Sequence, residues 1–183
     1  VYVGGGKQST LPGAMLDELF TALSMHFDIH PRAEKSFELD PAVISNRRLD
    51  VLKEHGFSHF SFGIQSLMAE VNQAHNRGPQ GRDTIAKCFN ALYERELYDV
   101  ACDFLLGLDG TTPEGTLSDI SWVLENFAPQ WIDVFQIAPT TDYVEKHFGG
   151  DLDRYWEHLA PFQKVVSSSF RKIARPLRYR VAT

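Results

Sequence analysis

Short apolar segments rich in β-branched and aromatic residues alternate along this chain with longer segments of helical periodicity. Alternation of this kind predicts a parallel sheet whose strands are joined by right-handed helical crossovers. Periodicity alone is compatible with two architectures, a doubly wound open sheet and a barrel. The expected strands are 1–3, 35–39, 57–64, 98–106, 131–137 and 177–181, and the expected helices are 16–27, 46–55, 83–95, 113–127 and most of 143–175.

The composition is typical of one globular domain. The 183 residues are 43% hydrophobic and 23% charged, with a formal net charge of −6. We expect a single domain over 1–183, with a helical segment from about 143 onward. No basic stripe indicates nucleic-acid binding, and no apolar run approaches the ~20 residues of a membrane span. The two cysteines form no disulfide framework, so a reducing cytoplasm is the expected compartment.

Polar residues or glycines follow every expected strand except the last. Because chemistry in parallel α/β folds gathers at the carboxyl ends of the strands, these residues predict a ring around one ligand, a small molecule. The alternative is that each residue only caps its own loop. The residues are Gly4, Gly5 and Gly6, then Glu38 and Asp40, then Gln65, then Asp103, then Gln136 and Ala138.

Each residue type suits a particular part of a ligand. The glycine run lets the backbone approach a ligand closely. Glu38 and Asp103 are acceptors for hydroxyl or ammonium groups, and Gln65 can both donate and accept. Arg77, in the loop region after the third strand, can pair with a carboxylate.

Six stretches carry a family resemblance, in an order that runs without a large gap to about residue 140. On these stretches the chain resembles the radical S-adenosylmethionine enzymes of the oxygen-independent coproporphyrinogen III oxidase group. The stretches are VYVGGG at 1–6, FELDP at 37–41, GFSHFSFGIQS at 56–66, NR at 76–77, CDFLLGL at 102–108 and VFQIAP at 134–139.

The resemblance implies a partial (β/α)6 TIM-like barrel that starts at the second strand. It also implies S-adenosylmethionine as cofactor, with the glycine run at its amino end. Glu38, Gln65, Arg77 and Asp103 match family positions that contact the amino acid and ribose parts, and Ala138 matches a position near the adenine. In the family, a C-x-x-x-C-x-x-C motif binds a [4Fe–4S] cluster that generates a 5′-deoxyadenosyl radical.

The chain departs from the family pattern at several points. The cluster motif is absent, and Cys88 and Cys102 fall in apolar segments where we expect buried packing residues. Lys7-Gln8 replaces the family's Thr-Pro, which puts a positive charge beside the expected cofactor ammonium, and Asp109 replaces a proline.

Two interpretations follow from these departures. In the first, the chain is a fragment of a radical enzyme whose natural N-terminus lies upstream, since no methionine opens it. In the second, it is a non-catalytic relative that acts as a binding or interaction domain. The missing first strand of the barrel also predicts self-association through open sheet edges.

Other candidate residues receive plainer interpretations. Two histidine pairs have i, i+4 spacing, but Pro31 ends the segment of His26/His30 and Gly56 breaks the helix between His55 and His59. With no third ligand near either pair, we expect surface histidines rather than metal ligands. We expect the three tryptophans to lie in the core; these are Trp122, Trp131 and Trp156.

Overall fold

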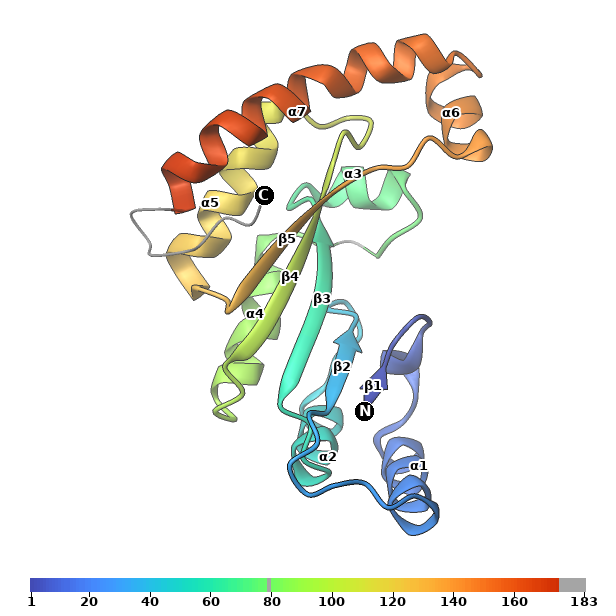
Figure 1. Cartoon of the computed structure of the whole chain (residues 1–183), viewed down its shortest axis with the longest axis vertical. Coiled ribbons are helices and arrows are strands. Elements are labelled where there is room, and N and C mark those ends of the chain that lie inside the picture. Colours follow the sequence, from blue (N-terminus) through green and yellow to red (C-terminus); the bar gives the residue numbers. More distant parts are fainter. Residues whose placement is uncertain (79, 175–183) are drawn as a thin grey trace.

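The computed structural model of the chain describes residues 1–78 and 80–174, and these residues form one parallel sheet (Figure 1). Its strand order is β1-β2-β3-β4-β5, and every neighbouring pair is parallel. The predicted strands are therefore confirmed, except 177–181, which lies outside the described residues. The strands are β1 (Tyr2–Val3), β2 (Ser36–Leu39), β3 (His59–Gln65), β4 (Asp99–Leu106) and β5 (Trp131–Gln136).

Helices connect the strands close to the predicted bounds. Two short elements were not predicted, the 3₁₀ turn η1 and the helix α3, because segments this short show no full period. The predicted helix at 143–175 is two helices in the described part, broken at Gly149 and Gly150, which have left-handed φ of 65° and 81°. The elements are η1 (Gln8–Thr10), α1 (Gly13–His26), α2 (Asn46–Glu54), α3 (Ala69–Ala74), α4 (Arg82–Tyr93), α5 (Pro113–Phe127), α6 (Thr141–Phe148) and α7 (Leu152–Ala174).

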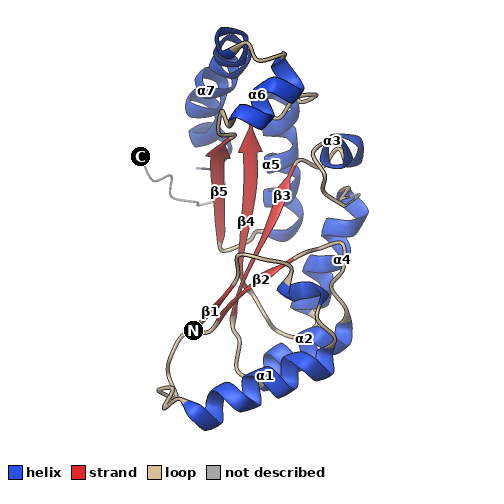
Figure 2. Cartoon of the chain, turned by 90° about the vertical axis from the view of Figure 1, so that its right-hand side faces the viewer, coloured by secondary structure: helices blue, strands red, loops and turns tan. Residues whose placement is uncertain are grey.

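The two faces of the sheet differ in chemistry. In Figure 2, α2, α4 and α5 lie along one side of the strands. Buried apolar side chains of β2 to β4 form one cluster with those of these three helices. We call this the outer face; it includes Phe37, Phe62 and Phe104, all at most 2% exposed. The other face, which we call the inner face, has alternate residues such as Glu38, Ser61, Gly63 and Asp103. This period-two pattern makes one face core and leaves the other for a ligand.

A second apolar cluster lies at the C-terminal edge of the sheet. Helix α7 contributes Tyr155, Leu159 and Phe162, and α6 contributes Val144 and Phe148. The Tyr155 hydroxyl donates to the carbonyl of Ile137 at 2.5 Å. These contacts fix α6 and α7 just beyond the ends of β4 and β5.

The tryptophan prediction was wrong for two of the three residues. Trp131 and Trp156 are 59% and 43% exposed. Trp131 lies on the inner face of β5 and is exposed there. Its segment of the sequence is apolar because the alternate residues, on the outer face, are the ones that pack against the core. Of the described helices, none is long and apolar enough to cross a membrane.

Candidate functional site

A cavity of about 540 Å³ opens at the carboxyl ends of the strands. We call it the strand-end cavity. Of the eight residues that the family resemblance places at the cofactor, five line it: Gly6, Glu38, Gln65, Arg77 and Asp103. These five come from the loops and strand ends of β1 to β4, so the sheet brings together residues that are up to 97 positions apart in the sequence. Lys7, Asp40, His75 and Gln80 also line it.

Gly4 and Gly5 lie behind this lining, against the Glu38 carboxylate. The Gly5 N–H donates to Glu38 Oε2 at 2.8 Å, and a Cβ on Gly4 would lie 2.5 Å from Glu38 Cδ. The Tyr2 hydroxyl donates to the other carboxylate oxygen of Glu38. This hydrogen bond, together with burial and the carboxylate charge, raises the pKa of Tyr2. Because glycines have no side chain, the backbone after β1 can approach the Glu38 carboxylate this closely.

Gln8, the second residue of the unusual Lys7-Gln8 pair, has a structural role that the sequence did not reveal. Gln8 accepts from the Gly6 N–H at 3.2 Å and donates to the Glu38 carbonyl at 2.8 Å. Ser9 donates to the same carbonyl at 3.0 Å and accepts from the Asp40 N–H at 3.0 Å. These hydrogen bonds join the turn after the glycine run to the end of β2. Lys7 itself is exposed and lines the cavity.

Gln65 has the most constrained side chain of the site. It ends β3 at a register shift, where Gly63 pairs with Asp103 and Gln65 with Phe104, and its φ is 64°. This left-handed conformation is uncommon for a residue with a side chain. Gln65 is 7% exposed, and its Oε1 is buried without a hydrogen-bond partner among the described residues. A buried acceptor without a donor favours a ligand that supplies one.

The loop after Gln65 is held by buried polar groups. Asp119 on α5 accepts from the Leu67 N–H at 2.8 Å and from the Ser66 hydroxyl at 3.2 Å. Asn72 on α3 donates to the Ser66 carbonyl at 2.7 Å. Burial raises the pKa of Asp119 even though these donors oppose the shift. Sequence reasoning missed Asp119 and Asn72, because polar residues on helices usually face solvent.

Asp103 lies among other carboxylates on the inner face. Its pKa is raised to about 6, first by burial and then by the charges of Asp133 and Glu38, while Arg77 lowers it. Asp133 is the register partner of Asp103 on β5. The sequence analysis missed Asp133, although its alternation with Ile132 and Val134 could have placed it on the inner face.

A smaller apolar hollow of about 150 Å³ adjoins the cavity, with Gln65, His75 and Arg77 in the walls of both. We call it the side hollow. Leu105, Leu108, Ile137 and Tyr143 supply its apolar walls. Ala138, predicted to lie near the adenine, follows Ile137 but is exposed and lines neither space.

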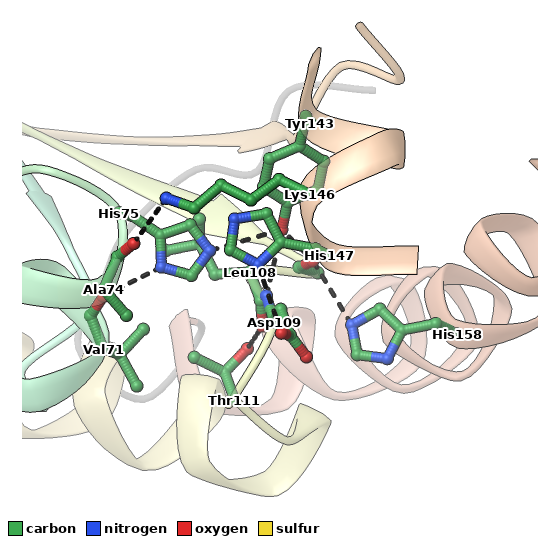
Figure 3. A network of polar contacts seen from close by, with 11 residues as sticks. Val71, Ala74, His75, Leu108, Asp109, Thr111, Tyr143, Lys146, His147 and His158 are labelled. Atoms are coloured by element: carbon green, nitrogen blue, oxygen red, sulfur yellow. Dashed lines mark hydrogen bonds and ion pairs between the residues drawn. The ribbon is translucent and has the colours of Figure 1, made fainter. Parts of the chain in front are cut away.

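A network of rings and charges holds α6 beside the side hollow (Figure 3). The rings of His75 and His147 stack with centroids 4.6 Å apart and an interplanar angle of 4°. The Tyr143 hydroxyl accepts from the Asp109 N–H at 3.0 Å, and His147 Nδ1 lies 3.2 Å from Asp109 Oδ2. Asp109, one of the departures from the family pattern, is therefore a contact between the β4–α5 loop and α6.

The described residues do not fit an iron–sulfur cluster. Cys88 and Cys102 are both buried in the core, as predicted, and burial raises the pKa of each thiol, to about 12 for Cys88. A cluster of this family needs three accessible thiolates, and the chain has two cysteines. Within 1–78 and 80–174, no group of three His, Cys, Asp or Glu side chains could hold a metal ion. His55 and His59 instead pair with Asp17 and Asp99.

Comparisons with known proteins place this arrangement in a family. Oxygen-independent coproporphyrinogen III oxidase of Salmonella typhimurium is 32% identical over 171 residues, which cover 92% of this chain and 37% of that protein. The heme chaperone HemW of Synechocystis is 30% identical over 119 residues, covering 65% of this chain and 28% of that protein. No family model matches the chain.

A solved structure supports the same family assignment. The coproporphyrinogen III oxidase HemN of Escherichia coli, described as a radical SAM enzyme, superposes with a TM-score of 0.76 at 25% identity, covering 94% of this chain and 40% of that one. The sheet and its strand-end cavity thus define a partial TIM-like barrel of the radical S-adenosylmethionine type. Within that class, the chain is a relative of the oxygen-independent coproporphyrinogen III oxidases and of HemW. It spans little more than a third of the length of the oxidase it matches in sequence.

Proposed function

We propose that this chain binds S-adenosylmethionine in the strand-end cavity. The observation that carries the proposal is the buried Oε1 of Gln65, which has no hydrogen-bond partner within 1–78 and 80–174 and lies in one cavity with Glu38, Asp103 and Arg77. The cofactor carries groups complementary to these residues: an ammonium and ribose hydroxyls that can donate to the carboxylates and to the amide oxygen, and a carboxylate for the guanidinium of Arg77. The glycine run then lies at the amino end of the cofactor.

The cavity residues fit this cofactor, whereas the two buried cysteines do not fit the cluster. A [4Fe–4S] cluster, where a longer protein provided its ligands, would supply the electron for reductive cleavage of the cofactor into methionine and a 5′-deoxyadenosyl radical. The part that we assign to this chain is to bind and orient the cofactor. On this proposal, the chain is the cofactor-binding part of a cytoplasmic radical enzyme of the coproporphyrinogen III oxidase-like group, and its relatives' names point to porphyrin biosynthesis.

The alternative function is a non-catalytic binding or interaction domain. Lys7 favours it, because this positively charged residue lines the cavity in which the cofactor ammonium is expected. A Lys7→Thr variant tests this point. If Lys7 repels the cofactor ammonium, removing the like charge tightens S-adenosylmethionine binding; absence of binding to both Lys7→Thr and the wild type would favour the alternative function.

Calorimetric titration with S-adenosylmethionine tests the main proposal. We expect binding to the wild-type chain and at least about tenfold weaker binding in Asp103→Ala and in Glu38→Ala, since each loses a charge-assisted contact. Glu125→Gln, which changes an exposed carboxylate on α5, is the matched control and keeps wild-type affinity. Equal affinity in all four proteins would refute the assignment of the cavity.

We also propose self-association through the sheet edges. β1 and β5 are the edge strands of the described sheet. Unpaired edges offer rows of backbone donors and acceptors to a second copy. Size-exclusion chromatography with light scattering is expected to show a dimer or larger species, and a monomer across the concentration range would count against this proposal.

A further inference from the structure

The connection between β3 and α4 supplies five of the residues that line the strand-end cavity. Its described parts are 66–78 and 80–81. The regular element in them is α3, and a helix of six residues is too short to be stable by itself. Contacts with the rest of the fold must therefore hold the cavity residues in place. The five are His75, Asn76, Arg77, Gly78 and Gln80, and Gln65 directly precedes the connection.

The side-chain amide of Asn72, on α3, joins the two ends of this connection. Asn72 is completely buried. Its Nδ2 donates to the carbonyl of Ser66 at 2.7 Å and to the carbonyl of Gln80 at 3.0 Å, and it lies 3.4 Å from the carbonyl of Ile64. Ile64 and Ser66 flank Gln65, whereas Gln80 lies just before α4. One buried nitrogen thus holds the start and the end of the connection together.

The backbone of Asn72 holds the middle of the connection. Its carbonyl accepts from the Arg77 N–H at 2.9 Å and from the His75 N–H at 3.2 Å. Between these two residues the chain turns at Asn76, whose φ of 58° is left-handed. Asn72 therefore contacts the backbone on both sides of Gln65 and the backbone of Arg77, the two cavity side chains that meet above Gly63.

Stability alone is a poor explanation for an asparagine at this position. The Oδ1 of Asn72 is buried and has no hydrogen-bond partner among the residues that the structure describes. A buried acceptor without a donor opposes folding, and an apolar side chain would avoid that cost. What the asparagine adds is a nitrogen whose two hydrogens reach carbonyls from both ends of the connection.

We propose that Asn72 is a positioning residue for the strand-end cavity. Its amide sets the placement of Gln65 and Arg77 relative to each other and so determines how tightly the cavity binds its ligand. Asp119 differs from it, because Asp119 holds only the first end of the connection, at Ser66 and Leu67. The inference rests on the proposed function in taking S-adenosylmethionine as the ligand.

Asn72→Leu in the full 183-residue chain tests the role of the amide. Leucine keeps the approximate size of the side chain but has no N–H donors. We expect the affinity for S-adenosylmethionine, measured by calorimetry on protein shown to be folded by circular dichroism, to fall at least about tenfold. Asn90→Leu, the same substitution at an exposed position on α4, is the control and keeps wild-type affinity.

A milder variant keeps the test decisive if Asn72→Leu does not fold. Asn72→Ser offers one hydroxyl donor in place of two N–H donors, so we expect an affinity between those of the wild type and Asn72→Leu. Wild-type affinity in folded Asn72→Leu, or in Asn72→Ser where only that variant folds, would overturn the inference.

A double-mutant cycle with Arg77→Ala separates positioning from a general structural role. If Asn72 acts through Arg77, Asn72→Leu has less effect on affinity once Arg77 is truncated. With losses of about tenfold in each single variant, the double variant should then lose less than about a hundredfold. Losses that multiply fully would show that Asn72 does not act through Arg77 and would overturn the inference.

Amide hydrogen exchange of the free protein distinguishes failure of this inference from failure of the proposed function. In Asn72→Leu we expect faster exchange across 66–78 and unchanged exchange in α2. If this is seen but the wild type does not bind S-adenosylmethionine, the proposed function fails, and Asn72 still organises the connection. If the wild type binds the cofactor and exchange across 66–78 is the same in both proteins, the positioning role is refuted and the proposed function stands.

Discussion

The amide of Gln65 fills the space that a side chain on Gly63 would need: its Nε2 lies 2.1 Å from the Cβ position of residue 63, and Arg77 Nη1 lies 3.1 Å from it. Both side chains that meet there belong to the strand-end cavity, so the absence of a Cβ at Gly63 shapes the site itself.

Gly63→Ala should remove ligand binding while leaving the fold intact. The added methyl group meets two side chains rather than backbone, so we expect the circular dichroism spectrum to be retained. S-adenosylmethionine affinity should fall at least about tenfold by calorimetry. Gly81→Ala, where a Cβ would meet ordinary contacts at 3.8 and 3.9 Å, is the control and binds normally.

Asp103 should make the protein less stable as pH rises. The pKa of Asp103 is about 6 in the folded state, whereas the pKa of an aspartate in the unfolded chain is about 4. Between the two pKa values, the folded state binds more protons than the unfolded state. Asp103 therefore lowers the free energy of unfolding as pH rises, and the whole of this destabilisation is present above pH 6. Asp103→Asn should therefore be more stable than wild type by about 1 kcal/mol at pH 7.5, after allowance for solvent screening. Urea unfolding at pH 4 and pH 7.5 measures this; an advantage that does not grow with pH would contradict the prediction.

Asp119 should act as a positioning residue for Gln65. Asp119→Ala leaves the buried Leu67 N–H without its acceptor, which is expected to cost about 1–3 kcal/mol of stability. Because the loop that follows Gln65 then loses its tie to α5, S-adenosylmethionine binding should weaken as well. Asp119→Asn retains a carbonyl acceptor and is expected to recover part of both losses. If Asp119→Ala lowers stability without changing affinity in the folded protein, its role is structural only.

The contact between α6 and the β4–α5 loop should depend on His147. Its ring stacks on His75 and lies 4.6 Å from the Tyr143 ring centroid. His147→Ala removes both ring contacts and the pairing with Asp109, so we expect faster amide hydrogen exchange across Thr141–Phe148. Glu145→Ala, an exposed change on the same helix, is the control. Unchanged exchange in His147→Ala would show that the apolar contacts of Val144 and Phe148 suffice.

The sequence by itself determined the architecture and most of the cavity. Period-two and helical patterns encode which side chains must leave water, so they predicted the parallel sheet and its strands. Because parallel strands end at one edge, the list of strand-end residues already contained Gly6, Glu38, Gln65 and Asp103.

Only the tertiary structure decided how those residues are used. The left-handed turn of Gln65, the opposition of Asp103 and Asp133, and the tie from Asp119 to the loop after β3 depend on register and packing between distant segments. The same holds for Trp131, which lies in an apolar segment yet faces solvent, and for Ala138, which falls outside the cavity. A sequence pattern records how each segment divides between core and solvent, whereas contacts between segments arise only when the whole sheet and its helices are packed.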